Sequence, residues 1–169
     1  VTGIPYWDIE SSSDYPVYCN SIMASGAQAT GLYHKQRLVP FGEYIPLAGA
    51  LHWVAPGVKD EVTLAGFSAG DDQQKPLMIK NQRLAAGICY EMAYPNLTRK
   101  NAQNSDFMVT ISNDAWFTGT ASPWQHLQMV QMRAKENGRW FVRATNTGVT
   151  AFIDHQGQIV KQAPVDEAA

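Results

Sequence analysis

Residues 83–95, with the sequence RLAAGICYEMAYP, constrain the fold of this chain more than any other stretch. A short apolar run at 84–88 ends at Cys89, and Pro95 then suits the first turn of a helix. A short apolar run bounded by such signals is typical of a buried strand. Ligands collect at the carboxyl ends of strands in α/β folds, so we interpret Cys89 as the candidate nucleophile.

The other apolar and turn patterns alternate between strand and helix, which predicts a layered α/β fold in one domain. Residues 1–5 look like the end of a strand entering a turn, and residues 162–169 form a polar tail without strand or cap signals. Both ends therefore look as if they had been cut from a longer chain. Strands are predicted at 17–24, 32–35, 77–80, 84–89, 107–112, 141–144, 149–154 and 158–160, the first two as a hairpin, and helices at 47–54, 95–104 and from 122 onward.

The helix that begins at Ser122 carries the clearest boundary signals. Ser122 as N-cap, Pro123 at the first position and Gln125 at the third predict a capping box. Gly138 is placed to end the helix in the left-handed conformation. The apolar face expected to pack against the rest of the protein consists of Trp124, Leu127, Val130 and Ala134.

Composition and charge exclude several classes of protein and partner. The formal net charge of −2 at pH 7 gives no electrostatic reason to expect nucleic acid. Two cysteines are too few for a disulfide framework or a zinc motif, and we interpret Cys19 as a structural thiol. No apolar run approaches the roughly 20 residues that a membrane-spanning helix needs.

A nucleophilic cysteine needs a cation, a base or a helix dipole nearby, because a free thiol is mostly protonated at neutral pH. Lys35 ends a predicted strand and enters the loop that contains Glu43, so it is placed to point into a site; a solvated strand-end lysine is the alternative. Glu91 is either a carboxylate at a helix start or a positioner of the lysine, and spacing leaves that choice open. The histidines stand in no strong motif and at no metal-ligand spacing: His34, His52, His126 and His155.

Several ordered blocks resemble the nitrilase, or carbon-nitrogen hydrolase, superfamily: YHK at 33–35, LVPFGEY at 38–44, ICYE at 88–91 and SNDAWF at 112–117. Within it the chain is similar to the bacterial apolipoprotein N-acyltransferases. The blocks that extend this resemblance are PWQH at 123–126, RA at 133–134 and RATNTGVT at 143–150. The resemblance covers almost the whole chain, and the ordered set is far more specific than Cys-Tyr-Glu alone.

The resemblance implies an α-β-β-α sandwich, incomplete at both ends, so that the 169 residues form a partial carbon-nitrogen hydrolase domain. It implies a Glu-Lys-Cys triad with Cys89 as nucleophile and Lys35 as the lysine, which Glu43, a second glutamate, helps to hold. The backbone N–H of Tyr90 would join Lys35 in stabilising an oxyanion, and Glu91 would have a supporting role. The family's general-base glutamate lies upstream of the matched part, and the resemblance implies no cofactor and no metal.

The function implied by the resemblance is transfer of a fatty acyl chain from a phospholipid, through a cysteine thioester, to the N-terminal diacylglyceryl-cysteine of an apolipoprotein. Such an enzyme is held in the bacterial inner membrane by transmembrane helices, which the matched part lacks, with its catalytic domain on the periplasmic side. Without the general base, we expect this chain alone to be inactive. The alternatives are a soluble nitrilase-type amidase acting on a small C–N substrate and a non-catalytic fragment. Residues 47–54 are interpreted as an apolar approach for lipid or as a core-packing helix.

Overall fold

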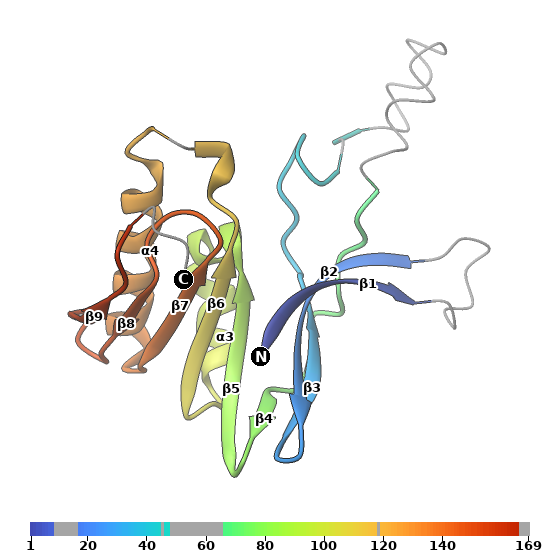
Figure 1. The fold of residues 1–169 in the computed structure, drawn as a ribbon. Coiled ribbons are helices and arrows are strands. Elements are labelled where there is room, and N and C mark those ends of the chain that lie inside the picture. The colour runs from blue at the N-terminus through green and yellow to red at the C-terminus, as the bar shows by residue number, and fades with distance from the viewer. Residues whose placement is uncertain (9–16, 45, 48–65, 118, 166–169) are drawn as a thin grey trace.

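A computed structural model of the chain describes residues 1–8, 17–44, 46–47, 66–117 and 119–165. These residues form a nine-stranded sheet in which the strands follow chain order (Figure 1). The strands are β1 (Thr2–Asp8), β2 (Val17–Gly26), β3 (Ala29–His34), β4 (Leu77–Ile79), β5 (Gln82–Ile88), β6 (Phe107–Ser112), β7 (Phe141–Thr145), β8 (Ala151–Ile153) and β9 (Ile159–Gln162). The helices are the short 3₁₀ turns η3 (Cys89–Ala93) and η4 (Ala115–Phe117) and the α-helices α3 (Pro95–Ala102) and α4 (Ser122–Asn137).

The two halves of the sheet face each other, and the α-helices lie on the outer side of the half that contains β5–β9 (Figure 1). Ile22 of β2 and Val109 of β6 belong to one buried cluster between the halves. Gly3 of β1 lies so close to β6 that a Cβ built on it would be 2.4 Å from the Cδ1 atom of Ile111. The described residues therefore build helix, sheet and sheet layers, which confirms the expected sandwich class and supplies one of its helical layers.

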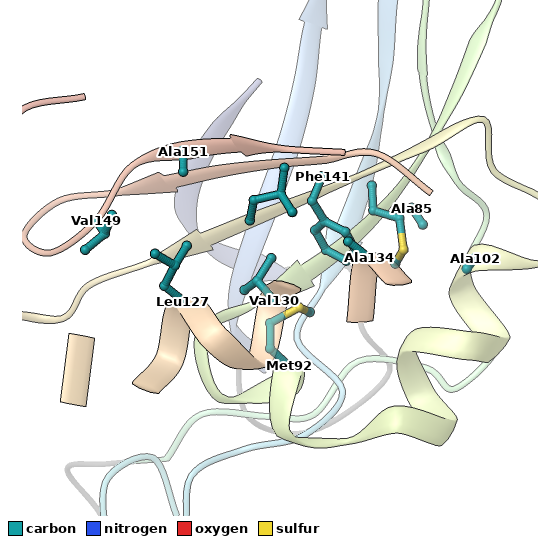
Figure 2. Close-up of a cluster of buried hydrophobic side chains, with 11 residues drawn as sticks. Ala85, Met92, Ala102, Leu127, Val130, Ala134, Phe141, Val149 and Ala151 are labelled. Atoms are coloured by element: carbon teal, nitrogen blue, oxygen red, sulfur yellow. The ribbon is translucent and has the colours of Figure 1, made fainter. Parts of the chain in front are cut away.

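The interface between the sheet and the helices is an apolar core that fixes the position of α4 (Figure 2). Phe141 of β7 is fully buried there against α4. Each fully buried apolar side chain of this size contributes about 1.5–3 kcal/mol relative to an exposed one. The helical side chains in this core are Met92, Ala102, Leu127, Val130 and Ala134.

Strand β5 is buried on both faces, which explains why its sequence is a continuous apolar run. Side chains alternate across a strand, so Ala85 enters the core under the helices while Leu84 and Ala86 enter the cluster between the halves. The strand is thereby held from both sides up to the residue before Cys89.

Three neighbouring strands of the helix-covered half, β5, β6 and β7, run in the same direction. Strand β6 pairs in parallel with both β5 and β7, and the partners at the end of the ladder include Ile88 with Ile111 and Ser112 with Thr145. The carboxyl ends of these strands therefore meet at one edge of the sheet. Cys89 and Asp114 follow two of those ends, at the edge where α/β folds gather their ligands.

Most predicted strands are confirmed, including the β2–β3 hairpin and the bounds of β6. The expectation that residues 1–5 end a strand is wrong, because β1 continues through Pro5 to Asp8. Among the described strands β1 lies at the sheet edge, where a proline without an N–H is tolerated. The predicted polar tail is also shorter than expected, since β9 extends to Gln162.

Helix α4 starts at Ser122, as predicted, but its cap differs from the prediction. Its N-cap is Ala121, which has no side-chain cap bond, so the capping box based on Ser122 is wrong. The physical reason is local: Ala121 already has helical backbone angles, and the amide of Ser122 donates to the hydroxyl of Thr120 at 3.2 Å. The left-handed end at Gly138 is confirmed by its φ of 59°.

The predicted apolar face of α4 is only partly correct. Leu127, Val130 and Ala134 are buried, whereas Trp124 is 47% exposed. Residues 48–54 of the helix predicted at 47–54 lie outside the described residues. Within the part of the chain that the structure describes, no helix has both the length and the apolar composition needed to cross a membrane.

Candidate active site

Cys89 occupies a strained turn directly after β5. It is the first residue of η3, it is half-buried, and its φ is 51°. Residues with a side chain rarely adopt this left-handed conformation, and such strain concentrates at functional sites. The turn brings a partly accessible thiol to the carboxyl edge of the sheet, as the sequence predicts.

Tyr90 follows in the first turn of η3. The first amide groups of a helix have no acceptor within the helix, so the Tyr90 N–H is suited to receive an oxyanion next to the sulfur. Its side chain is 42% exposed and packs edge-on against the ring of Tyr94, with centroids 5.6 Å apart. This position agrees with the role that the resemblance implies.

Lys35 follows β3 and is 1% exposed, so the alternative of a solvated strand-end lysine is wrong. Its Nζ atom lies 2.7 Å from each carboxylate oxygen of Glu43. Glu43 is held in turn by Asn20 Nδ2 at 2.6 Å and by the amide of Val39 at 2.8 Å. The loop after β3 thus folds back to give the buried ammonium a fixed carboxylate partner.

Glu91 is completely buried and collects donors from two separate segments. The amide of Ile88 donates to it at 2.7 Å from the turn after β5. The amides of Gln36 and Arg37 donate at 2.7 and 3.1 Å from the loop after β3. The hydroxyl of Tyr33 donates to both carboxylate oxygens at 3.1 Å. One carboxylate therefore joins the turn of the candidate nucleophile to the loop of the candidate lysine.

This network answers the question that spacing leaves open for Glu91. The carboxylate both receives amides at the start of η3 and positions the backbone that follows Lys35. Burial raises the pKa of the Glu91 carboxyl, against the hydrogen bonds from Ile88, Gln36 and Arg37, which lower it. Burial and the negative charge of Glu91 also raise the pKa of the Tyr33 hydroxyl well above its ordinary range.

A second polar cluster lies around Asp114, which is 1% exposed. Arg143 of β7, itself fully buried, donates through Nη2 to Asp114 Oδ2 at 2.6 Å. Ser112 donates to Oδ1 at 2.5 Å, and Nδ1 of His126 lies 3.1 Å from the same oxygen. Burial acts to raise the pKa of Asp114, but the hydrogen bonds from His126 and Ser112 and the charge of Arg143 outweigh it and hold the pKa below its ordinary value.

This second cluster also contacts the candidate nucleophile. Nε2 of His126 lies 2.9 Å from the carbonyl oxygen of Cys89. Burial lowers the pKa of Arg143, while the negative charges of Asp114 and Cys89 raise it. Arg143 and Cys89 are therefore coupled electrostatically.

Sequence reasoning assigns no role to Asp114, His126 or Arg143, and it sets His126 aside. The three come from the segment after β6, from α4 and from β7, so no sequence spacing brings them together. One signal was available: Asn113 and Asp114 directly follow the clearest buried strand. Residues that follow two neighbouring parallel strands lie at the same edge of the sheet. Polar residues after β6 are therefore expected beside a nucleophile that follows β5.

Donor atoms of Cys89, Asp114 and His126 lie within 4.8 Å of one another, the spacing of a possible metal site. The hydrogen bonds of Asp114 and His126 indicate a structural role instead of metal binding. Both oxygens of Asp114 and both ring nitrogens of His126 already face hydrogen-bonding partners. We therefore interpret the group as a hydrogen-bonding cluster that supports the nucleophile.

Comparisons with known proteins agree with this geometry. A family model described as carbon-nitrogen hydrolase matches residues 1–168. A protein from Acinetobacter baumannii described as glutamine-dependent NAD⁺ synthetase has a similar structure, with a TM-score of 0.72 at 17% identity over 99% of this chain and 29% of that chain. At this identity the structural likeness concerns the fold alone.

Two curated relatives are much closer in sequence. The apolipoprotein N-acyltransferase of Pasteurella multocida is 50% identical over 138 residues, which are 81% of this chain and 26% of that protein. The apolipoprotein N-acyltransferase of Pseudomonas syringae pv. tomato is 43% identical over 164 residues, which are 97% of this chain and 32% of that protein. The chain thus spans about a third or less of the length of these relatives.

Proposed function

The chain belongs to the carbon-nitrogen hydrolase family, and from that premise we propose that it carries the nucleophile and lysine of an apolipoprotein N-acyltransferase. The observation that carries the proposal is the buried carboxylate of Glu91. It joins the turn of Cys89 to the backbone that follows Lys35, and so holds a thiol and an ammonium on neighbouring segments. A fixed cation near a thiol favours the thiolate.

In the first step the sulfur of Cys89 attacks the carbonyl carbon of a phospholipid acyl ester. The tetrahedral oxyanion is stabilised by the ammonium of Lys35 and by the backbone N–H of Tyr90. The C–O bond of the ester then breaks, and a lysophospholipid leaves with the proton that the thiol gave to the general base. The acyl chain stays on Cys89 as a thioester. The general base is a glutamate outside these 169 residues.

In the second step the free α-amino group of a diacylglyceryl-cysteine attacks the thioester carbonyl. The C–S bond breaks and returns the thiolate of Cys89, while the amine gives a proton to the general base and becomes an amide. Each substrate uses the same oxyanion donors, since both steps pass through a tetrahedral oxyanion on the same carbon.

Exposed apolar side chains on the segments around the site support a lipid substrate. Phe41 and Leu47, on the loop that follows Lys35, are each 80% exposed. Trp116 of η4, at the same edge of the sheet, is 85% exposed. A contiguous apolar surface marks sites that bind lipid or protein, and we propose that these side chains contribute to one. It fits an active site at the bacterial inner membrane, on the periplasmic side, with the phospholipid as acyl donor and the apolipoprotein as acceptor.

The test is to detect the covalent intermediate in the complete protein that contains this chain. The protein is incubated with phospholipid, digested and analysed by mass spectrometry. We expect a hydroxylamine-sensitive acyl group on the peptide with Cys89, its loss in Cys89→Ser and its retention in Cys19→Ser. Hydrolysis of a small amide without a lipid adduct would establish the amidase alternative instead. Neither adduct nor hydrolysis would indicate a non-catalytic protein.

A further inference from the structure

We propose that His126, anchored by Asp114, is a positioning residue that orients the peptide group between Cys89 and Tyr90, and with it the N–H that receives the oxyanion. The inference deepens the proposed function and rests on it, because it takes Cys89 as the nucleophile. It adds a residue to the site that the Glu-Lys-Cys triad does not include.

The ring of His126 is held between two acceptors. Its Nδ1 atom lies 3.1 Å from Oδ1 of Asp114, and its Nε2 atom lies 2.9 Å from the carbonyl oxygen of Cys89. A carbonyl oxygen only accepts, so Nε2 carries a proton. Asp114 is ionised, because the buried guanidinium of Arg143 donates to its other oxygen at 2.6 Å. Nδ1 therefore also faces an acceptor, so both ring nitrogens are placed to donate.

The carbonyl that His126 binds belongs to the same rigid unit as the Tyr90 amide. A trans peptide group is planar, with its C=O and N–H pointing in opposite directions. No cis peptide bond occurs among the described residues. A donor that fixes the Cys89 carbonyl on one side therefore fixes the direction of the Tyr90 N–H on the other.

The strained backbone of Cys89 needs the hydrogen bond from His126 to keep its conformation. Cys89 has a φ of 51°, a conformation that a residue with a side chain leaves easily unless its surroundings hold it. The hydrogen bond from His126 to the Cys89 carbonyl supplies part of that hold. Donation to the carbonyl also polarises the peptide group, which makes its N–H a better donor to an oxyanion.

The orientation of the His126 ring is fixed by its neighbours. The charged and titratable groups that contact it in the described structure are Asp114 and Cys89, with Arg143 behind the carboxylate. His126 is on the first turns of α4, whose next buried residue, Leu127, packs in the core against the sheet. The carboxylate and the core together leave the ring little freedom to turn away from the nucleophile.

Two substitutions separate the contacts of the ring. In His126→Gln the side-chain amide reaches as far as Nε2 and keeps a neutral donor to the Cys89 carbonyl. In His126→Asn the shorter amide occupies the place of Nδ1, so it keeps the contact to Asp114 and loses the contact to Cys89. His155→Gln, at the exposed turn after β8, is the control for replacing a histidine.

The experiment uses the complete protein and two reactions of Cys89: single-turnover acylation by phospholipid, which needs the oxyanion donor, and alkylation by iodoacetamide, which does not. Alkylation is measured at a pH at which the thiol is ionised in every variant. We expect His126→Asn to acylate on the order of 100-fold more slowly, the usual loss for one oxyanion donor, and His126→Gln to stay within about tenfold of the parent. Alkylation should change less than about threefold in both, since a correctly folded thiolate needs no oxyanion donor.

Acylation of His126→Asn at the parental rate would overturn the inference and leave the proposed function intact. An equal fall of acylation and alkylation in both variants would also overturn it, because it would show a general loss of structure. If the parent protein forms no acyl adduct, the proposed function fails and the inference fails with it.

Discussion

Glu43 holds Lys35 with both carboxylate oxygens, each 2.7 Å from the Nζ atom. The side chain of Lys35 is 2% exposed and that of Glu43 is 14% exposed, so water contributes little to the solvation of the ammonium. A buried charge without its partner is strongly unfavourable, and the two residues therefore act as one unit. The pair converts a flexible lysine into a fixed positive charge, on a loop that Glu91 joins to the turn of Cys89.

Replacing Glu43 with glutamine should destabilise the protein and stop acylation. The amide keeps the shape of the side chain but leaves the ammonium of Lys35 uncompensated, which costs about 3 kcal/mol or more in a buried pair. Chemical unfolding and the rate of adduct formation measure the two effects. The control is Asp72→Asn, whose carboxylate is 81% exposed and pairs with Lys100, itself 47% exposed; its loss should change stability by less than about 1 kcal/mol. Similar stability losses in the two variants would contradict the prediction.

Cys89 should react with iodoacetamide at neutral pH much faster than Cys19, by at least about tenfold, because Cys89 is half-buried and Lys35 is its proposed cation, while Cys19 is 3% exposed. Lys35→Ala should remove most of that difference. Peptide mass spectrometry after timed alkylation gives both rates in one sample. An unchanged rate ratio in the variant would show that Lys35 does not act on the sulfur.

Gly148→Ala should disturb the cluster under the nucleophile. Gly148 has a φ of 108°, and a Cβ there would lie 2.7 Å from Oδ2 of Asp114, which cannot move without loosening Arg143. We expect a stability loss of about 1–3 kcal/mol and slower acylation. Gly138→Ala is the matched control: its φ of 59° is also left-handed, but nothing lies within 4 Å of the added Cβ. The control should lose about 1 kcal/mol and keep its acylation rate, and a slowed control would count against the prediction.

The stability of the protein should fall at acidic pH, and Asp114 should account for part of the fall. The folded pKa of Asp114 is below the ordinary value of 3.8, so the unfolded chain binds more protons at this carboxyl than the folded one does. Its contribution is therefore fully present above about pH 3.8 and is lost as the pH falls through the lowered value. The free energy of unfolding measured from pH 6 to pH 2 should decline less in Asp114→Asn. The exposed carboxylate of Asp72 provides the control, since Asp72→Asn should leave the decline as steep as in the parent.

Local patterns were enough to predict the strands around the site. The run at 107–112 has the bounds of β6, and the apolar run before Cys89 is β5, because a strand buried on both faces needs an unbroken series of apolar residues. The start of α4 at Ser122 was also predicted correctly, but its capping box was not. The Thr120 hydroxyl receives the Ser122 amide, a competition that sequence preferences for capping do not include.

For the site, the sequence pointed to the nucleophile, the lysine and two glutamates through the order of a few blocks. It could not show whether Lys35 is buried, because burial depends on how the loop after β3 closes over the residue. The role of Glu91 was equally open, since its donors come from residues 36–37 as well as from the adjacent turn.

The sequence by itself determined the α/β pattern, the position of Cys89 at the end of a buried strand and the family to which the chain belongs. Each of these depends on neighbouring residues or on their order along the chain. Only the tertiary structure brought His126 to the carbonyl of Cys89 and Arg143 to Asp114. These residues come from different elements, and the parallel register of β5, β6 and β7 decides which of them meet at the edge of the sheet.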